Sequence, residues 1–572
     1  MAAPACAQKR ATRNTRAEEI QSVYQQGLEA LRQGDLVAAS AAFEHAIRLA
    51  PVVPEPHNSL GWVRLTQGHP DEAIAEFRTA LKLKAAFLQA RVNLANALLQ
   101  KGDMAGAETE AREATRQFPT DADAHHTLGR VLSLQGDRTQ SIAELRRALA
   151  IDPQRADIHD DLGAELAQNG QPEEATSEFV EALRLQPGLA SAKLHLGVSR
   201  WQQHSLDEAQ TLLRSAVELA PQSAPTHYYL ARVLHDLSRP EEAIAELQAA
   251  TSLQPEFADA QTQLGLALQR TENTSGAVDA FRKVVELKPD DPDAHNNLGL
   301  ALMQSGEAEP SVAEFQVAAR LRPEDTSYRE NLGVAYLQKA DFDAAVAEFR
   351  GALKTSPGTA TLHYNLGLAL KLKDQLAEAV PELQKAAELD PQQADVRYTL
   401  GVTFWQMGEF SKAVEQLRAA IQSNPEYAEA HYTLGTVLKQ QGQFPAAGAE
   451  LREAIRLQPD FAGAHTTLAA VLRQLGDADG AAKEAAAGQA ISKEKTALQA
   501  ATFSTHSGIR LMKAGDLDGA IAQFRSAIQQ SPMYAPAHYQ LGRALAQKGA
   551  PAEAEAEFRR AEQLDARLKS SH

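Results

Sequence analysis

An all-α fold built from tandem helical hairpins is predicted by three features of this sequence. The chain of 572 residues is rich in Ala, Leu, Glu and Gln, which favour helices, and only 5% of its residues are aromatic. A Leu-Gly or Leu-Ala pair recurs every 34 residues along most of the chain. Glycine and proline follow each pair at fixed distances, where they would end helices. A fold made of repeated helices explains all three features.

The 34-residue spacing runs without a slip through thirteen consecutive pairs, whose small residues extend from Gly61 to Ala469. Gly27 continues the register upstream, and Gly508 and Gly542 resume it after five extra residues, which makes sixteen units. We number this small residue position 8 of its unit. Position 20 is then Ala or Ser in all sixteen units, position 24 is Phe, Leu or Ala, and position 32 is Pro in thirteen. Agreement at so many positions indicates a structural repeat.

Each recurrent residue has a physical reason. Small residues at positions 8 and 20 let the two helices of a unit approach to the ~8 to 10 Å of close helix packing. Glycine at position 15, as in Gly34, ends the first helix as a C-terminal glycine does. Proline at position 32, as in Pro51, ends the second helix because it cannot continue the hydrogen-bond ladder. The turn glycine is replaced in five units, by His204, Ser238, Glu272, Ala340 and Asp374.

This pattern resembles that of the tetratricopeptide repeat family, which has Leu at position 7, Gly at 8, Ala at 20, Phe at 24, Ala at 27 and Pro at 32. The resemblance covers roughly residues 20 to 568. It implies a right-handed superhelical solenoid of antiparallel helix-turn-helix units with a concave inner face. It also implies that the chain binds other proteins or peptides.

The sequence departs from the family at position 4, which is usually Trp but is His in nine units, among them His57, His295 and His431. Successive histidines of this ladder would lie about one helix spacing apart, ~8 to 10 Å. Two ligands of one zinc ion must lie within ~4.5 Å of each other. We therefore expect these histidines to pack between helices, and we expect neither a metal site nor a cofactor.

The repeat register predicts the division of the chain. Residues 1–19 are expected to form a disordered basic segment, and residues 20–495 the first fourteen repeats. Residues 496–500 are an insertion that could serve as a hinge, because five extra residues break the stacking register and Lys493 replaces the expected proline. Residues 501–568 are expected to hold the last two repeats with a polar C-terminal cap, and residues 569–572 a tail.

Composition excludes several classes of function. A formal net charge of -17 disfavours nucleic acid as a partner, and no apolar stretch approaches the ~20 residues of a membrane span. Walker, dinucleotide-binding and HExxH motifs are missing from the sequence, so we expect no enzyme. The first residues lack the apolar region of a secretory signal. A soluble cytoplasmic protein is expected, or a periplasmic or secreted one if the start lies within a truncated signal peptide.

Positions 2, 5, 6, 9, 12 and 13 of the first helix share one outward arc, which in this family lines a groove for peptides. We single out three sets on this arc: Asn297, Asn331 and Asn365 at position 6; Tyr364, Tyr398 and Tyr432 at position 5; and Lys371, Trp405, Lys439 and Arg473 at position 12. The asparagines could pair with the backbone of an extended peptide, the aromatic rings add rigid contact area, and the cations favour acidic segments. The alternative is that these are ordinary solvated positions of the repeat.

The sequence therefore predicts a non-catalytic scaffold that holds extended segments of partner proteins in a concave groove. A second hypothesis is a substrate-recruitment or accessory subunit that acts with a separate enzyme, such as a protein glycosyltransferase, or with a secretion or assembly machine. Association between copies of the chain is compatible with either. Binding of chaperone tails is disfavoured, because the family's carboxylate clamp needs Lys at position 5 and no unit has it.

Overall fold

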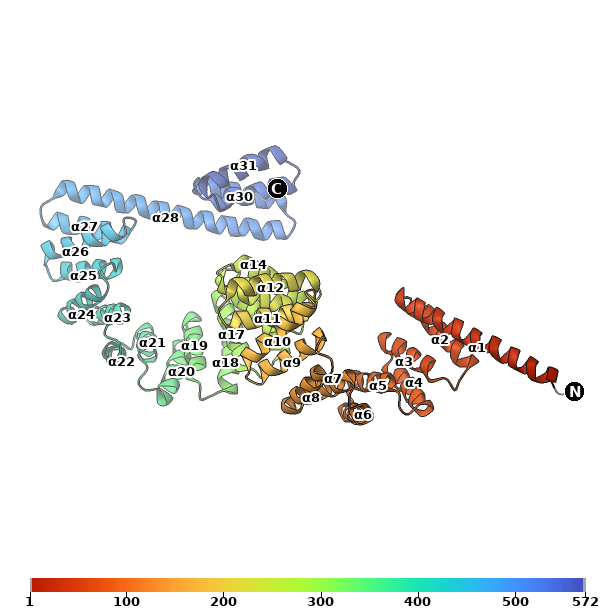
Figure 1. Cartoon of the computed structure of the whole chain (residues 1–572). Coiled ribbons are helices and arrows are strands. Elements are labelled where there is room, and N and C mark those ends of the chain that lie inside the picture. The colour runs from red at the N-terminus through yellow and green to blue at the C-terminus, as the bar shows by residue number, and fades with distance from the viewer. Residues whose placement is uncertain (1–2, 569–572) are drawn as a thin grey trace. The chain divides into compact units, whose positions relative to one another are not determined.

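The computed structural model describes residues 3–568, with side chains from Arg16 onward. Within this range the chain forms 31 α-helices and no strand, so the all-α solenoid expected from the repeat is confirmed. The chain separates into two compact units, residues 1–289 and residues 290–572. In each unit the two helices of a repeat pack against each other, and each repeat then packs on its neighbour (Figure 1).

The described part of the first unit contains sixteen helices. They are α1 (Ala3–Arg32), α2 (Leu36–Leu49), α3 (Pro54–Thr66), α4 (Pro70–Leu83), α5 (Leu88–Lys101), α6 (Met104–Gln117), α7 (Ala122–Leu134), α8 (Arg138–Ile151), α9 (Ala156–Gln168), α10 (Pro172–Leu185), α11 (Ala190–Gln202), α12 (Leu206–Leu219), α13 (Ala224–Asp236), α14 (Pro240–Leu253), α15 (Ala258–Arg270) and α16 (Thr274–Leu287). Odd-numbered helices are the first helices of their repeats and even-numbered helices are the second.

The described part of the second unit contains fifteen helices. They are α17 (Pro292–Gln304), α18 (Ala308–Leu321), α19 (Thr326–Gln338), α20 (Phe342–Thr355), α21 (Ala360–Leu372), α22 (Leu376–Leu389), α23 (Ala394–Gln406), α24 (Phe410–Ser423), α25 (Ala428–Gln440), α26 (Phe444–Leu457), α27 (Ala462–Gln474), α28 (Ala478–Lys513), α29 (Leu517–Gln530), α30 (Ala535–Gln547) and α31 (Pro551–Leu564). Helix α28 belongs to two repeats and is treated separately below.

The turn between the two helices of a repeat has the same conformation throughout. All eleven glycines at position 15 have φ between 75° and 84°. At Gly68, for example, the backbone N–H donates to the Leu65 carbonyl at 3.1 Å, and the next N–H, of His69, donates to the Arg64 carbonyl at 2.9 Å, which closes the helix end. The five residues that replace this glycine keep the turn, with φ between 59° and 63°. The ends predicted for first helices with glycine at position 15 are therefore confirmed, and the same turn forms in the five units without it.

Close packing explains the small residue at position 8. A Cβ atom placed on Gly61 would lie 2.7 Å from the Phe77 ring, and one on Gly163 would lie 2.5 Å from the Phe179 ring, so neither site has room for a side chain. The Phe77 and Phe179 side chains at position 24 are almost completely buried. In the third repeat, where Ala95 stands at position 8, position 24 is itself alanine. The two positions thus share one space between the helices.

Histidines at position 4 join the two helices of a repeat and the turn before it. Their Nδ1 atoms lie 2.5 to 2.7 Å from a glutamate nineteen residues later, in the pairs His57–Glu76, His125–Glu144, His159–Glu178, His227–Glu246, His295–Glu314, His363–Glu382, His431–Glu450, His465–Glu484 and His538–Glu557. At His431, Nε2 also lies 3.2 Å from the Pro425 carbonyl oxygen. The ladder packs between helices as expected, and these polar contacts are an addition that the sequence analysis did not foresee.

The N-terminal segment differs from the prediction of disorder for residues 1–19. Helix α1 already begins at Ala3 and continues through the first repeat to Arg32, so residues 3–19 are helical. The segment contains no glycine, its one proline is in the first turn of the helix, and Ala, Gln and Arg favour a helix. Residues 1–2 lie outside the described range.

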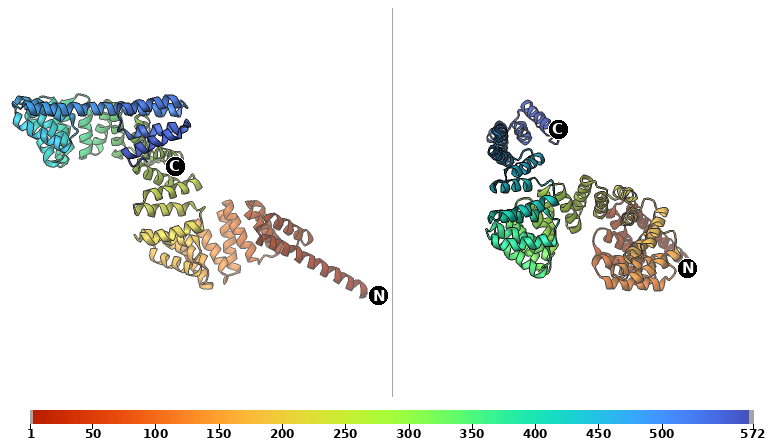
Figure 2. Two further views of the ribbon diagram at one scale, coloured as in Figure 1. Left: turned by 90° about the horizontal axis from the view of Figure 1, so that it is seen from above. Right: turned by 90° about the vertical axis from the view of Figure 1, so that its left-hand side faces the viewer.

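The insertion at residues 496–500 does not interrupt the backbone. Helix α28 runs for 36 residues from Ala478 to Lys513, and it serves both as the second helix of repeat 14 and as the first helix of repeat 15 (Figure 2). Because Lys493 stands where proline ends the second helix elsewhere, nothing stops the helix. A hinge at 496–500 would thus require bending within a helix. The separation of residues 501–568 as a domain remains a prediction, and the tail 569–572 lies outside the described residues.

Candidate functional site

All ten residues singled out in the sequence lie on first helices of the second unit. Helices α17 and α19 hold Asn297 and Asn331. The other eight are Tyr364, Asn365 and Lys371 on α21, Tyr398 and Trp405 on α23, Tyr432 and Lys439 on α25, and Arg473 on α27. Nine of the ten are half-buried, and Arg473 is exposed. Since each of these helices contacts the next first helix, the structure brings the ten residues onto one continuous face.

The asparagine amides already take part in stacking the repeats. Asn331 Nδ2 donates to Asn296 Oδ1 of the preceding repeat at 2.8 Å, and Asn365 Nδ2 donates to Glu330 Oε1 at 3.1 Å. Each bond joins position 6 to position 5 of the repeat before it. An amide has two N–H donors and one acceptor oxygen, so these asparagines keep only part of their capacity for a peptide. Pairing with a peptide backbone stays a prediction.

Two of the three tyrosines at position 5 are held by aromatic residues of the turn that follows their own repeat. The Tyr398 ring centre lies 5.0 Å from that of Tyr427, and the Tyr432 ring centre lies 4.6 Å from that of Phe461. The Tyr427 hydroxyl donates to Asp395 Oδ1 at 2.7 Å, and burial together with this carboxylate raises the pKa of Tyr427. Two of the three tyrosines are thus fixed in place, which lowers the entropy they would lose on contact with a ligand.

Position 12 forms a row of three cations and one indole. Trp405 Nε1 donates to Gln440 Oε1 at 2.7 Å, which orients the ring. Among the described residues, no carboxylate forms an ion pair with Lys371, Lys439 or Arg473. Lys371 is half-buried, and this burial lowers the pKa of its amine. A partly desolvated cation without a counter-charge would gain from an anionic group supplied by a ligand.

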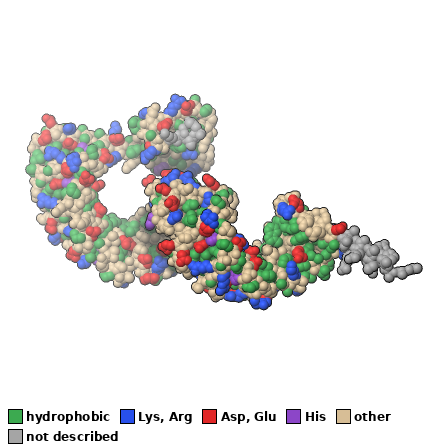
Figure 3. Space-filling model, viewed as in Figure 1, with side chains coloured by type: hydrophobic (Ala, Val, Ile, Leu, Met, Phe, Trp, Pro, Cys, Tyr) green, Lys and Arg blue, Asp and Glu red, His purple; other side chains and the backbone are tan. Residues whose placement is uncertain are grey.

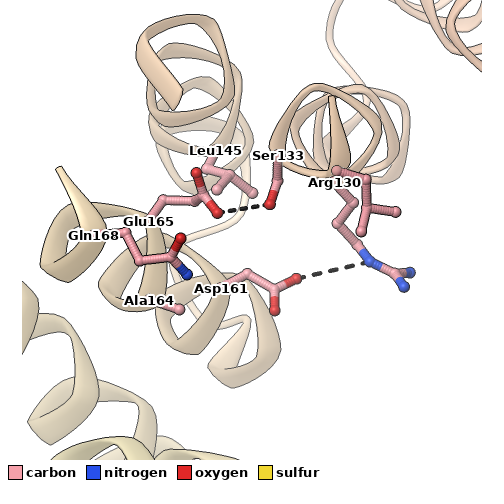
Figure 4. A pocket seen from close by; sticks show the side chains of 8 residues that line it. Arg130, Ser133, Leu145, Asp161, Ala164, Glu165 and Gln168 are labelled. Atoms are coloured by element: carbon pink, nitrogen blue, oxygen red, sulfur yellow. Dashed lines mark hydrogen bonds and ion pairs between the residues drawn. The ribbon is translucent and has the colours of Figure 1, made fainter. Parts of the chain in front are cut away.

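The first unit presents a different set of side chains on the same arc. Asp160 Oδ1 and His195 Nδ1 are 2.7 Å apart, and Asp161 Oδ2 and His126 Nε2 are also 2.7 Å apart. Next to Asp161 is a cavity of about 220 Å³ between α7 and α9, which is also lined by the buried Glu165 (Figure 4). Sequence analysis missed this cavity. The signal that could have found it is a charged residue, Glu165, at position 10, which is small and uncharged in thirteen of the sixteen units.

An aromatic cluster further along the first unit satisfies its own polar groups. Trp201 Nε1 donates to Asp236 Oδ2 at 2.7 Å, and the Arg232 guanidinium lies 4.8 Å from the Trp201 ring. Arg232 also donates to the Tyr228 hydroxyl at 2.9 Å. Since each group already has a partner within the cluster, we interpret it as stabilising this part of the inner face.

In the part of the chain that the structure describes, no three His, Cys, Asp or Glu side chains are grouped so that they could hold a metal ion. Over the same range, no helix is long and apolar enough to cross a membrane. Lys and Arg side chains are interspersed with Asp and Glu on the face shown in Figure 3. The candidate binding residues described above lie along the first helices of each unit.

The geometry defines a class of protein: a solenoid of stacked helical hairpins that offers the side of its first helices as an interaction scaffold. Family models identify the type of repeat. A tetratricopeptide repeat model matches residues 24–86, 58–122, 92–156, 161–224, 330–394, 398–457, 432–493 and 507–567, a second such model matches residues 200–265, and a TPR repeat model matches residues 270–306. The chain belongs to the tetratricopeptide repeat family, whose repeat is typically a non-catalytic scaffold for protein interactions.

Solved structures share the fold only. The Cut9–Hcn1 hetero-tetramer of APC/C is 15% identical with a TM-score of 0.35, covering 79% of this chain and 96% of the other. YrrB, a TPR protein with an unusual peptide-binding site, is 28% identical with a TM-score of 0.29 over 33% and 97% of the two chains. PilF of Pseudomonas aeruginosa is 21% identical with a TM-score of 0.34 over 36% and 94%. These low TM-scores carry no argument about function. Comparison with curated proteins finds no match.

Proposed function

We propose that the inner face of repeats eleven to fourteen holds an extended, acidic segment of a partner protein, and that the chain acts as a non-catalytic scaffold through this face. One observation carries the proposal. Lys371 is half-buried without a carboxylate partner, and it begins a row in which Lys439 and Arg473 also form no ion pair within 4.0 Å among the described residues. Carboxylates of a peptide bound along this row would supply the counter-charge that each cation lacks.

The spacing of the row suits an extended chain. First helices of neighbouring repeats lie ~10 Å apart, and an extended peptide advances ~3.3 Å per residue, so one repeat corresponds to about three residues. The cations of repeats eleven, thirteen and fourteen would then meet side chains about six and then three residues apart along a segment of about nine residues. Trp405, between Lys371 and Lys439 in the row, would supply an apolar contact in the middle.

The experiment compares affinity capture by two variants of the whole chain from lysate of its native organism. The test variant is Lys371→Ala, Lys439→Ala and Arg473→Ala. The control variant is Arg320→Ala, Lys354→Ala and Arg418→Ala, which removes the same charge from exposed positions of second helices in the same unit. Proteins captured by the wild type and the control but lost from the test variant would be partners of the face.

A second step decides whether those proteins bind through the proposed segment. Acidic peptides from each lost protein, about nine residues long, are titrated with the purified chain. Binding to wild type and control but not to the test variant supports the proposal, and a captured enzyme among the partners would favour the accessory-subunit hypothesis. If the test variant captures the same proteins as the wild type, the face has no role in partner binding and the proposal fails.

A further inference from the structure

A second candidate site lies in the first unit, in the cavity between α7 and α9. The cavity of about 220 Å³ is lined by Arg130, Ser133, Leu134, Leu145, Asp161, Ala164, Glu165 and Gln168. Ser133 and Ala164 stand at positions 12 and 9, where most other repeats have larger side chains such as Leu99 and Leu300. The small side chains leave room between neighbouring first helices, and Figure 4 shows the polar residues arranged around that space.

Glu165 is out of place in the repeat. In thirteen of the sixteen units, position 10 is a small uncharged residue that is at most 8% exposed, and Val63, Val131 and Val233 are completely buried there. The other charged residues at position 10 are Glu29 and Arg510, and both are exposed. Glu165 is only 6% exposed. A charge at a core position of a repeat is unfavourable unless it is paired, so its presence needs a reason.

The Glu165 carboxylate is only half satisfied. Ser133 Oγ donates to Glu165 Oε1 at 2.6 Å, whereas Oε2 is buried without a hydrogen-bond partner among the described residues. The one cation that lines the cavity, Arg130, has its Nε 4.0 Å from Asp161 Oδ2. Asp161 in turn contacts His126 at 2.7 Å, so Arg130 and His126 both face Asp161. The Oε2 atom of Glu165 is therefore a buried acceptor without a donor among the described residues.

We propose that this cavity binds an alkyl ammonium or guanidinium group, namely the side chain of a lysine or arginine in a partner protein. The charged group would pair with Glu165, and the aliphatic stem would lie along Leu134, Leu145 and Ala164, as the stems of long basic side chains do on apolar surfaces. The described residues offer no third ligand for a metal ion here, so a cationic organic group fits better. The site rests on residues of the first unit alone and is independent of the function proposed for the second.

The test uses the full-length protein and saturation-transfer NMR, which observes weakly bound ligands directly. The probes are a Gly-Ser peptide with one central lysine, the same peptide with norleucine in place of lysine, and n-butylammonium as a free amine. The variants are Glu165→Gln, which keeps the shape and removes the charge, and Glu218→Gln. Glu218 is exposed on α12, so the second variant matches the charge change away from the cavity.

The lysine peptide is expected to bind wild type and Glu218→Gln with saturation of its ε-CH₂ protons, and to bind Glu165→Gln at least about ten-fold more weakly. Weaker binding of the norleucine peptide is expected for every variant. Binding of n-butylammonium as tight as that of the peptide would also support the site and would identify free amines as its ligands. Equal binding of the lysine peptide to wild type and Glu165→Gln, or of the norleucine and lysine peptides to wild type, would overturn the proposal. Circular dichroism of each variant confirms that it is folded.

Discussion

The inner faces of the two units differ in charge although their backbones follow the same repeat. In repeat five the arc holds Asp160 and Asp161 at positions 5 and 6, and the buried Glu165 follows at position 10. In repeats eleven to fourteen it holds Lys371, Lys439 and Arg473 with Trp405 among them. The residues that pack a repeat are the same in both units, so the outward positions are free to vary. One scaffold can therefore carry sites of opposite charge.

The two faces also differ in how their charges are balanced. Of the three acidic side chains on this face of the first unit, two are paired, since His195 contacts Asp160 and His126 contacts Asp161 at 2.7 Å each, and Glu165 is the exception. In the second unit the cations of position 12 form no ion pair among the described residues. The comparison shows that missing counter-charges, more than charge itself, mark where a ligand would fit.

The largest expected effect is on binding of acidic peptides by the second unit. Replacing Lys371, Lys439 and Arg473 together with alanine should weaken binding of an acidic peptide of about nine residues on the order of 100-fold, because each ionic contact contributes roughly 1 kcal/mol. Fluorescence anisotropy with a labelled peptide measures this. The lysine-containing peptide that probes the cavity of the first unit should bind this variant as tightly as it binds the wild type. Parallel loss of both would show that the two faces are not separate sites and would break the comparison.

The second prediction concerns the cost of the buried carboxylate. Glu165→Val places in repeat five the residue found at the same position in repeats two, four and seven. It should stabilise repeats four to six by about 1 to 3 kcal/mol, because an unpartnered buried charge is removed. Hydrogen exchange of peptides from α7 to α10 measures the gain locally, as neighbouring repeats in a solenoid unfold in part independently. Slower exchange is expected there and unchanged exchange in the second unit. Destabilisation would mean that Glu165 is needed for packing.

A third prediction tests whether the backbone is equivalent in both units. Ala340 and Glu272 occupy the turn position with φ of 59° and 60°, where glycine is less strained. Ala340→Gly and Glu272→Gly should each stabilise their own repeat by about 0.5 to 1 kcal/mol, after the greater chain entropy of glycine is allowed for. Gly306→Ala, at a φ of 80°, should have the opposite sign. Thermal unfolding followed by circular dichroism measures all three. A gain in one unit only would mean that the turns differ.

The smallest effect is expected in the pH dependence of binding to the second unit. Burial lowers the pKa of Lys371 below the lysine value of ~10.4, so this side chain loses its charge at a lower pH than an exposed lysine does. Affinity for an acidic peptide should then fall as the pH rises through this lowered pKa. Lys371→Arg should remove that part of the fall, because arginine stays charged. An identical pH profile for both proteins would show that Lys371 does not contact the ligand.

The positions of the candidate site residues could largely be predicted from the sequence, but their hydrogen bonds and their burial could not. The 34-residue register placed Asn331, Asn365 and Lys371 on one arc of the first helices, since side-chain direction follows directly from helical geometry. It could not show that the Asn331 and Asn365 amides donate to the preceding repeat, because those bonds depend on how far one first helix is displaced along the next. Nor could it show the burial of Lys371, which depends on neighbouring side chains.

The sequence by itself determined the sixteen hairpins, the helix ends and the buried positions, because each of these depends on local residues repeated at a fixed spacing. The structure shows that the five residues that replace the turn glycine keep the turn, with φ between 59° and 63°. The tertiary structure alone decided the helical course of residues 3–19 and of residues 496–500 within α28, and it alone revealed the cavity beside Glu165. The two helical segments lie outside the 34-residue pattern, and they continue because no residue there ends the helix. The cavity arises where neighbouring repeats meet, so it depends on contacts between helices that the spacing does not contain.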